Sequence, residues 1–230
     1  MTETNVTTDL PTVAEFWDAA ADTFDRDADH GLRDIPVREA WRARLVGWLP
    51  PAPAGVLDLG CGTGSLSLLL TELGHHVVGL DLSAAMVDAA REKCLGRSAR
   101  FAQADAADPD PALLGDDRQV DVVLARHLLW TLPDPHAALA HWVGLVRPGG
   151  RLVLVEGHWS VPGGPSAYAR GADAMPWSSG ARAEEVSAAL DPLVDHLQVV
   201  CLSDDPTLWG RPVDDERYAV VASVPAPPRA

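Results

Sequence analysis

In the stretch VLDLGCGTGSLS (residues 56–67), a short apolar run passes through closely spaced glycines into a helix-like segment. The apolar run reaches Asp58, and then Gly60, Gly62 and Gly64 stand at alternate positions before Ser65. Glycine permits a tight turn and lets a ligand approach the backbone. The N–H groups at the start of the following helix can donate to polar ligand atoms. The stretch therefore predicts a strand, a ligand-binding turn and a helix.

On the C-terminal side of this stretch, apolar runs of strand length alternate with helical segments. Strands are expected at residues 56–60, 76–82, 99–105, 120–127 and 151–158. Helices are expected at 65–74, at 83–96 and from 135 onward, with a Pro-Gly-Gly turn at 148–150. This alternation predicts βαβ units, and hence a parallel α/β sheet with helices on both faces. After an irregular stretch and a helix near 181–190, two last strands are expected at 196–202 and 217–224.

On the N-terminal side, two helices are expected before the first strand. The first begins near Thr12 and runs toward Phe24, and a loop follows at 25–36, where Gly31 and Pro36 act as breakers. The second helix has apolar residues at steps of four, four and three, namely Val37, Trp41, Leu45 and Trp48. Prolines in LPPAPAG (49–55) end it. A chain of 230 residues with this pattern fits one domain.

Composition and charge narrow the class of partner. The chain has 33 acidic and 18 basic side chains, and its net charge of −15 argues against nucleic acid or an anionic membrane surface as a partner. No apolar run is long enough for a transmembrane helix, and MTETNVTTDLP (1–11) lacks the features of a secretory signal. Cys61, Cys94 and Cys201 form no metal-binding pair. A sparse, odd number of cysteines predicts a cytoplasmic protein with free thiols.

The ligand expected at the glycine turn contains adenosine. Asp81 stands 21 residues after Gly60, at the end of the second predicted strand, where a carboxylate can accept hydrogen bonds from ribose hydroxyls. An NAD site would place its third glycine or alanine at Ser65, but the third glycine here is Gly64. A phosphate-binding loop of the Gly-x-x-x-x-Gly-Lys type is absent, because no lysine follows the glycines. The spacing favours an adenosine-containing ligand other than NAD.

The motifs together resemble the class I S-adenosylmethionine-dependent methyltransferases over about residues 55–160. The first motif of that family, Asp/Glu-x-Gly-x-Gly-x-Gly, stands here at residues 58–64. AQADAAD (102–108), DVVLARHLLWTLPDP (121–135) and LVRPGGRLVLVEG (145–157) match later motifs in the same order. The resemblance implies a seven-stranded, Rossmann-like sheet in the order 3-2-1-4-5-7-6, with the last strand antiparallel. It also implies S-adenosylmethionine as the cofactor.

The same resemblance assigns roles to segments and residues. Residues 12–48 are expected to form an N-terminal helical lid, 55–158 the cofactor-binding core, 159–192 an insertion on the substrate side and 195–224 the last two strands. Asp81 is expected to hold the ribose, and Asp105 to read the adenine. The full set of expected cofactor-binding residues is Phe24, Asp58, Gly60, Cys61, Gly62, Gly64, Asp81, Leu82, Met86, Asp105, Ala106 and Arg126.

Candidate residues for contact with the methyl acceptor, the molecule that receives the methyl group, follow the fourth and fifth strands. Open α/β sheets place their ligands at the carboxyl ends of these strands. His127 and His158 are candidate catalytic bases, since imidazole titrates near neutral pH. Loss of a general base lowers kcat by about 10²–10⁴-fold. Packing or structural hydrogen bonding is the alternative role for each histidine. Further candidates for contact with the acceptor are Trp17, His30, Trp130 and Trp159.

The sequence thus predicts a methyltransferase that acts on an O or N atom of a small molecule, with a secondary metabolite as one expected acceptor. No separate docking domain is evident. No metal requirement is expected, because a metal site would need several carboxylates at the ends of the fourth and fifth strands, and only Glu156 lies close, with Asp134 farther away. A monomer or homodimer is expected. The alternatives are a NAD-dependent reductase and a non-catalytic interaction module. A reductase would need a Tyr-x-x-x-Lys pair, which neither Tyr168 nor Tyr218 provides, or a second domain. A degenerate glycine turn would favour a non-catalytic module, but the glycines here are intact.

Overall fold

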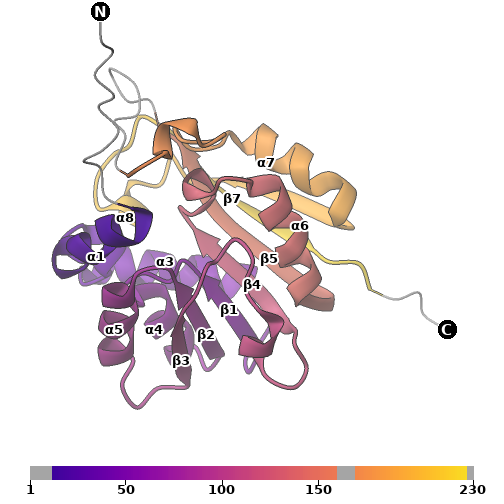
Figure 1. Ribbon diagram of the computed structural model, residues 1–230, viewed down its shortest axis with the longest axis horizontal. Helices are drawn as coiled ribbons and strands as arrows, with labels where there is room; N and C mark the ends of the chain where they lie inside the picture. Colours follow the sequence, from indigo (N-terminus) through magenta and orange to yellow (C-terminus); the bar gives the residue numbers. More distant parts are fainter. Residues whose placement is uncertain (1–11, 160–168, 227–230) are drawn as a thin grey trace, which may run out of the picture.

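The computed structural model describes residues 12–159 and 169–226. Within them, seven strands form one sheet in the order β3-β2-β1-β4-β5-β7-β6 (Figure 1). β7 runs antiparallel to both β5 and β6, whereas the other pairs are parallel. The predicted fold class and strand order are therefore confirmed. The strands are β1 (Gly55–Leu59), β2 (His76–Asp81), β3 (Ala99–Gln103), β4 (Val120–Arg126), β5 (Val146–His158), β6 (His196–Cys201) and β7 (Glu216–Ser223).

Helices cover both faces of this sheet (Figure 1). α3 (Ile35–Trp48), α4 (Ser65–Glu72) and α8 (Pro206–Trp209) pack on one face, and α6 (Pro135–Leu145) and α7 (Ala183–Leu190) pack on the other. α5 (Ala84–Lys93) packs against β3 through a third apolar cluster. α1 (Val13–Phe24) and α2 (Ala28–Gly31) precede α3 in the chain. Among the described residues, no helix has the length and apolarity needed to cross a bilayer.

The central strands are buried on both sides, which explains their nearly continuous apolar sequence. In β1, Val56 belongs to the cluster beneath α3 and α4, while Leu57 belongs to the cluster beneath α6. Successive side chains of a strand point to opposite faces, so neighbouring residues supply different layers. Both side chains are fully buried. Burial of apolar surface on the two faces therefore holds β1 at the centre of the sheet.

The expected lid, residues 12–48, divides into two parts with different surroundings. Val37, Trp41 and Leu45 of α3 are buried in the core under the sheet, and the indole N–H of Trp41 donates to Leu208 O at 2.8 Å. α1 and α2 lie farther out. We therefore use "lid segment" for residues 13–31 alone, which the next subsection describes.

Three other segments differ from the sequence-based expectation. The loop expected at 25–36 contains α2 and the start of α3, because Asp34 caps that helix by accepting from Val37 N. The Pro-Gly-Gly turn at 148–150 lies within β5, at a shift in its register with β4. α8 lies in the stretch 204–216 between the last two strands, where no helix was expected, since Leu208 and Trp209 are buried in the core. Part of the insertion expected at 159–192 lies outside the described residues.

The strand order places a crevice at the carboxyl ends of β1 and β4. Chain connections from these two neighbours lead to opposite sides, since β1 continues toward β2 and β4 toward β5. At such a switch point the loops separate and leave room for a ligand. The fold therefore brings together the glycine turn after β1, the end of β2 and the turn after β4.

Candidate active site

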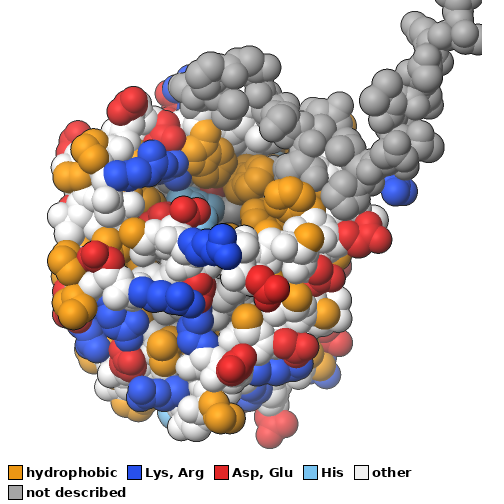
Figure 2. Space-filling model, turned by 90° about the vertical axis from the view of Figure 1, so that its left-hand side faces the viewer, with side chains coloured by type: hydrophobic (Ala, Val, Ile, Leu, Met, Phe, Trp, Pro, Cys, Tyr) orange, Lys and Arg blue, Asp and Glu red, His pale blue; other side chains and the backbone are white. Residues whose placement is uncertain are grey.

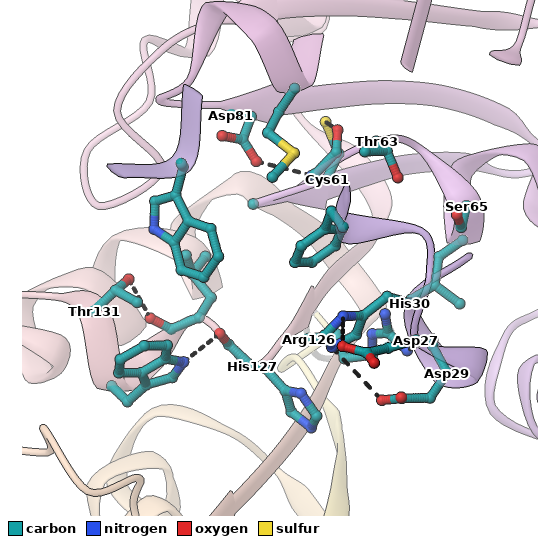
Figure 3. A pocket seen from close by; sticks show the side chains of 18 of the residues that line it. Asp27, Asp29, His30, Cys61, Thr63, Ser65, Asp81, Arg126, His127 and Thr131 are labelled. Carbon is teal, nitrogen blue, oxygen red and sulfur yellow. Dashed lines mark hydrogen bonds and ion pairs between the residues drawn. The ribbon is translucent and has the colours of Figure 1, made fainter. Parts of the chain in front are cut away.

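A pocket of about 730 Å³ occupies this crevice. Figure 3 shows Asp81 and Cys61 at one end and His127 at the other. On the face of the molecule in Figure 2, a hollow lies between hydrophobic and charged side chains, and histidine shows inside it. All but two of the residues predicted from the sequence line this pocket, the two exceptions being Gly64 and His158. The lining residues among the predictions are Trp17, Phe24, His30, Asp58, Gly60, Cys61, Gly62, Asp81, Leu82, Met86, Asp105, Ala106, Arg126, His127, Trp130 and Trp159.

The glycine turn, residues 60–64, is held against the end of β2. Gly62 N donates to Asp81 Oδ2 at 2.8 Å, and Ser83 N donates to Asp81 Oδ1 at 2.9 Å. Gly62 has φ +53°, and a Cβ there would lie 3.4 Å from the ring of Phe24. Burial raises the pKa of Asp81, while these backbone hydrogen bonds oppose the rise. The turn therefore presents bare backbone and one carboxylate, whose oxygens retain lone pairs, to the pocket.

Asp58 and Arg126 place opposite charges in the middle of the pocket. Asp58 is buried at the end of β1 and accepts a hydrogen bond from Ser67 Oγ at 2.5 Å. Burial raises its pKa to about 6, although Ser67 and Arg126 oppose this rise. Arg126, at the end of β4, donates to Asp29 O at 2.6 Å and stacks over Trp41. This part of the pocket can pair with a group that carries both an ammonium and a carboxylate.

The lid segment, residues 13–31, is fastened to the cofactor side at two points. Asp18 Oδ1 accepts from Ser83 Oγ at 2.5 Å and from Ala85 N at 3.0 Å, which ties α1 to the start of α5. Asp25 pairs with Lys93 Nζ at 2.9 Å, and the same ammonium donates to Thr63 and Ser65 beside the glycine turn. The lid segment therefore covers the glycine turn through specific contacts. Lys93 is the only lysine in the chain, and its role was not predicted.

The far end of the pocket is aromatic and contains His127. The residue has φ +53°, a backbone conformation that a histidine rarely adopts. Its ring stacks on Trp209 with the ring centres 5.8 Å apart and meets Trp159 edge-to-face at 5.6 Å. Arg217 Nη1 lies 3.4 Å from His127 Nε2. Burial, with the guanidinium groups of Arg126 and Arg217, holds the pKa of His127 well below its usual range.

Glu156 fixes the turn that carries His127. Its Oε1 accepts from Leu128 N at 2.9 Å and from Leu129 N at 3.0 Å, and His127 N donates to Val155 O. Glu156 is fully buried, and no protein group within the described residues pairs with its Oε2. Burial raises the pKa of Glu156 to about 7, although the two backbone donors oppose the rise. Glu156 is therefore a positioning residue, because its hydrogen bonds fix the backbone that follows His127 in the pocket wall.

The raised pKa of Glu156 predicts a pH-dependent stability. Between about pH 4.5 and 7 the folded chain holds this proton more tightly than the unfolded chain, so the free energy of unfolding should fall as pH rises through that window. A difference of about 2.5 pH units at 1.36 kcal/mol each gives a fall of about 3 kcal/mol. Glu156→Gln should remove this contribution. Urea unfolding at pH 5 and pH 8 measures it.

The matched control for that experiment is Glu39→Gln. Glu39 makes the same carboxyl-to-amide change at a side chain that is 59% exposed and meets Arg42 only at 3.7 Å. Glu39→Gln should keep the pH dependence of the parent chain. An equal pH dependence in the parent and in Glu156→Gln would contradict the proposed state of Glu156.

Several lining residues were not predicted from the sequence. Trp209, Arg217 and Met175 line the pocket and come from segments that carry no recognised motif, whereas Thr131 lies within the 121–135 motif but was not singled out. His158 instead forms a β-bridge with Gly180 beyond the end of the pocket lining. Among the residues that the structure describes, no three His, Cys, Asp or Glu side chains are grouped closely enough to hold a metal ion.

Comparison with known proteins adds three findings. Residues 57–154 match the family described as a methyltransferase domain. The chain is 31% identical over 146 residues to a demethylmenaquinone methyltransferase of Clavibacter sepedonicus, covering 63% of this chain and 57% of that protein. It is 32% identical over 148 residues to a ubiquinone biosynthesis O-methyltransferase of Aeromonas salmonicida, covering 64% of this chain and 61% of that protein.

Among solved structures, the fold is similar to the N-methyltransferase NodS of Bradyrhizobium japonicum in complex with S-adenosyl-L-homocysteine. The TM-score is 0.63 at 16% identity, and the match covers 91% of this chain and 98% of that chain. At this identity the likeness concerns the fold alone. The two curated relatives are matched over less than two thirds of their own length.

Proposed function

Since the chain belongs, over residues 57–154, to the class I S-adenosylmethionine-dependent methyltransferase family, we propose that it methylates an O or N atom of a small molecule. The observation that carries the proposal is the single pocket surface that joins the glycine turn and Asp81 to an aromatic end with His127 and Arg217. A ligand can thus reach both ends at once. The expected acceptor is small, because the lid segment covers part of the crevice.

The residues present fit S-adenosylmethionine. Asp81 offers carboxylate lone pairs suited to a ribose diol, and the bare backbone at Gly62 leaves space that a Cβ would restrict. Leu82, Met86 and Ala106 give an apolar setting for adenine, with Asp105 beside them. We propose that Asp58 and Arg126 face the ammonium and carboxylate of the methionine part. The bound cofactor would supply an electrophilic methyl group on a sulfonium.

The chain's own contribution is then positioning and exclusion of water. An in-line displacement depends on holding the acceptor lone pair against the methyl carbon, and good orientation is worth about 7–11 kcal/mol of barrier. Phe24 and Trp17 of the lid segment meet edge-to-face at 6.0 Å, and Trp17 also meets Trp130 at 6.3 Å. These rings join the lid segment to the acceptor end. We propose that they keep bulk water from the reacting atoms.

His127 is expected to orient the methyl acceptor by a hydrogen bond rather than to act as the general base that takes the acceptor's proton. The imidazole is neutral at pH 7, and protonation would add a third positive charge beside Arg126 and Arg217. His127→Gln keeps a hydrogen-bonding side chain, so kcat should fall by less than tenfold, against about 10²–10⁴-fold for loss of a general base. Turnover of a hydroxyl acceptor at pH 6–9 tests this. A loss of a hundredfold or more would make His127 the base.

The experiment that tests the proposal follows S-adenosylhomocysteine formation from S-adenosylmethionine. Purified chain is incubated with a panel of phenols, carboxylic acids and amines, and the methylated product is identified by mass spectrometry. Asp81→Ala serves as the negative control, because it removes the carboxylate assigned to the ribose. Product from at least one acceptor, lost in Asp81→Ala, is the expected result. Product formed equally well by Asp81→Ala would overturn the assignment of this pocket.

A further inference from the structure

Arg217 is a buried cation at the acceptor end of the pocket. It is only 9% exposed, yet it lines the pocket. Its guanidinium carbon lies over the indole rings of both Trp159 and Trp209, at 5.3 and 5.2 Å from the ring centres. Two aromatic faces therefore hold the guanidinium plane in place, and cation–π attraction strengthens the arrangement.

One edge of the Arg217 guanidinium donates hydrogen bonds to Asp215, whereas the opposite edge keeps N–H groups that no close protein acceptor takes within the described residues. Nε and Nη2 donate to the two carboxylate oxygens of Asp215 at 2.6 and 2.9 Å. Nη1 meets His127 Nε2 at the long distance of 3.4 Å. Among the described residues, no other acceptor takes the remaining N–H groups of Nη1 and Nη2. Because an arginine has five N–H donors, the edge away from Asp215 keeps donors for a ligand.

The backbone around Arg217 leaves it space to reach the pocket. Gly157 of β5 pairs with Arg217 of β7, and a Cβ on Gly157 would lie 2.9 Å from Arg217 Cδ. Gly180 has φ +81°, and a Cβ there would lie 2.5 Å from the Trp159 ring. Each glycine thus makes room for one member of the stack. A side chain at either position would push Arg217 or Trp159 out of this arrangement.

The walls beside this edge are flat and aromatic. Trp130 and Trp159 meet edge-to-face at 5.6 Å, and His127 meets Trp159 in the same way. Flat rings bind well against such surfaces, by stacking or by edge-to-face contact. His127 is neutral, so it adds a hydrogen-bonding group but no second charge at this point.

From this geometry we propose that Arg217 binds an anionic oxygen, a carboxylate or an ionised phenol, of a planar aromatic acceptor held against Trp130 and Trp159. Asp215 is the positioning residue that fixes the guanidinium edge. The inference rests on the proposed function, because it names the acceptor class of the same pocket. A guanidinium beside a phenol also favours the ionised form of that phenol. Such an acceptor needs no strong base at His127.

The test measures binding of probe acids by titration calorimetry, with S-adenosylhomocysteine present at saturation. At pH 8 the first pair is 2-naphthoate and the uncharged 2-naphthamide, and the second is 4-nitrophenol, which is ionised, and nitrobenzene. A charge-assisted hydrogen bond should make the anion of at least one pair bind about tenfold to a hundredfold more tightly. Tighter binding of the anion in the first pair would identify the acceptor group as a carboxylate, and tighter binding in the second pair would identify it as a phenolate.

Two variants assign the preference to Arg217. Arg217→Gln should reduce it to less than threefold, and Arg217→Lys should leave only part of it, since lysine lacks the planar fork. Arg44→Gln is the matched control, because Arg44 also pairs with an aspartate, at 2.9 Å from Asp205, but lies outside the pocket lining. It should keep the full preference. Binding of S-adenosylhomocysteine to each variant shows that the variant is folded and that its cofactor site is intact, independently of its affinity for the probe acids.

Three results would overturn the inference. The first is equal affinity of the parent chain for the anionic and the uncharged probe in both pairs. The second is a preference that survives in Arg217→Gln, and the third is no binding of any aromatic probe. Each of these leaves the proposed function standing if S-adenosylhomocysteine binds. Failure of S-adenosylhomocysteine to bind the parent chain would instead count against the proposed function itself.

Discussion

Asp81→Ala is expected to lower the affinity for S-adenosylhomocysteine by about a hundredfold or more. A hydrogen bond to a charged group contributes about 1.5–3 kcal/mol, and two ribose hydroxyls facing one carboxylate give at least a hundredfold in affinity. The substitution also frees Gly62 N and Ser83 N, which now donate to this carboxylate at 2.8 and 2.9 Å. The glycine turn thus loses one anchor to β2 and keeps another, since Cys61 N donates to Leu80 O at 3.0 Å. Titration calorimetry of the parent and the variant measures the change.

Asp88→Ala is the matched control for this prediction. This substitution also removes one carboxylate, from α5 in the same region of the chain. The Asp88 side chain, however, is 75% exposed and pairs only with Arg91. Its affinity for S-adenosylhomocysteine should stay within about twofold of the parent, since exposed ion pairs contribute only about 0–1 kcal/mol. Equal affinity in Asp81→Ala and the parent would show that the carboxylate does not hold the nucleoside.

Gly64→Ala is expected to lower the free energy of unfolding by about 2–5 kcal/mol. Gly64 has φ +78°, a left-handed conformation that costs about 1–2 kcal/mol for a residue with a Cβ. That Cβ would also lie 2.9 Å from Ala90 Cβ and 3.0 Å from Ala90 Cα, and overpacking adds about 1–3 kcal/mol. Because backbone atoms of α5 make the contact, it cannot be relieved by a rotamer change. Urea unfolding measures the loss.

Gly96→Ala separates backbone strain from steric contact. Gly96 has φ +75°, close to that of Gly64, but a Cβ there would have no neighbour within 4 Å. We expect a loss of about 1–2 kcal/mol, the cost of the left-handed conformation alone. Equal losses in Gly64→Ala and Gly96→Ala would contradict the close packing of the glycine turn against α5.

The fold and the cofactor end of the pocket could be predicted from the sequence, because their signals are local. Buried parallel strands read as short apolar runs, and the glycine turn keeps Gly60, Gly62 and Gly64 within five residues. Asp81 follows at the end of the next strand, so its place beside the turn follows from strand order. In the structure Gly64 does not line the pocket, since its role is packing against α5.

The acceptor end could not be predicted in the same way, because its parts are distant in sequence. Arg217 reaches Trp159 only through the antiparallel pairing of β5 and β7, which sets Gly157 opposite Arg217. Trp209 comes from α8, a single turn within an acid-rich stretch whose composition resembles a solvated loop. The short helix forms because burial of Leu208 and Trp209 outweighs that local preference. Tertiary contacts therefore decide this end of the pocket.

Titration calorimetry of the parent chain with S-adenosylhomocysteine and, separately, with NADH shows which adenosine-containing cofactor the pocket binds. We expect saturable binding of S-adenosylhomocysteine with one site per chain and no binding of NADH. The cofactor assignment follows from the pocket at Asp81 and the glycine turn, so Asp81→Ala should abolish or greatly weaken the same signal. Binding of NADH alone would contradict the account in favour of a reductase, and binding of neither would contradict it in favour of a non-catalytic module.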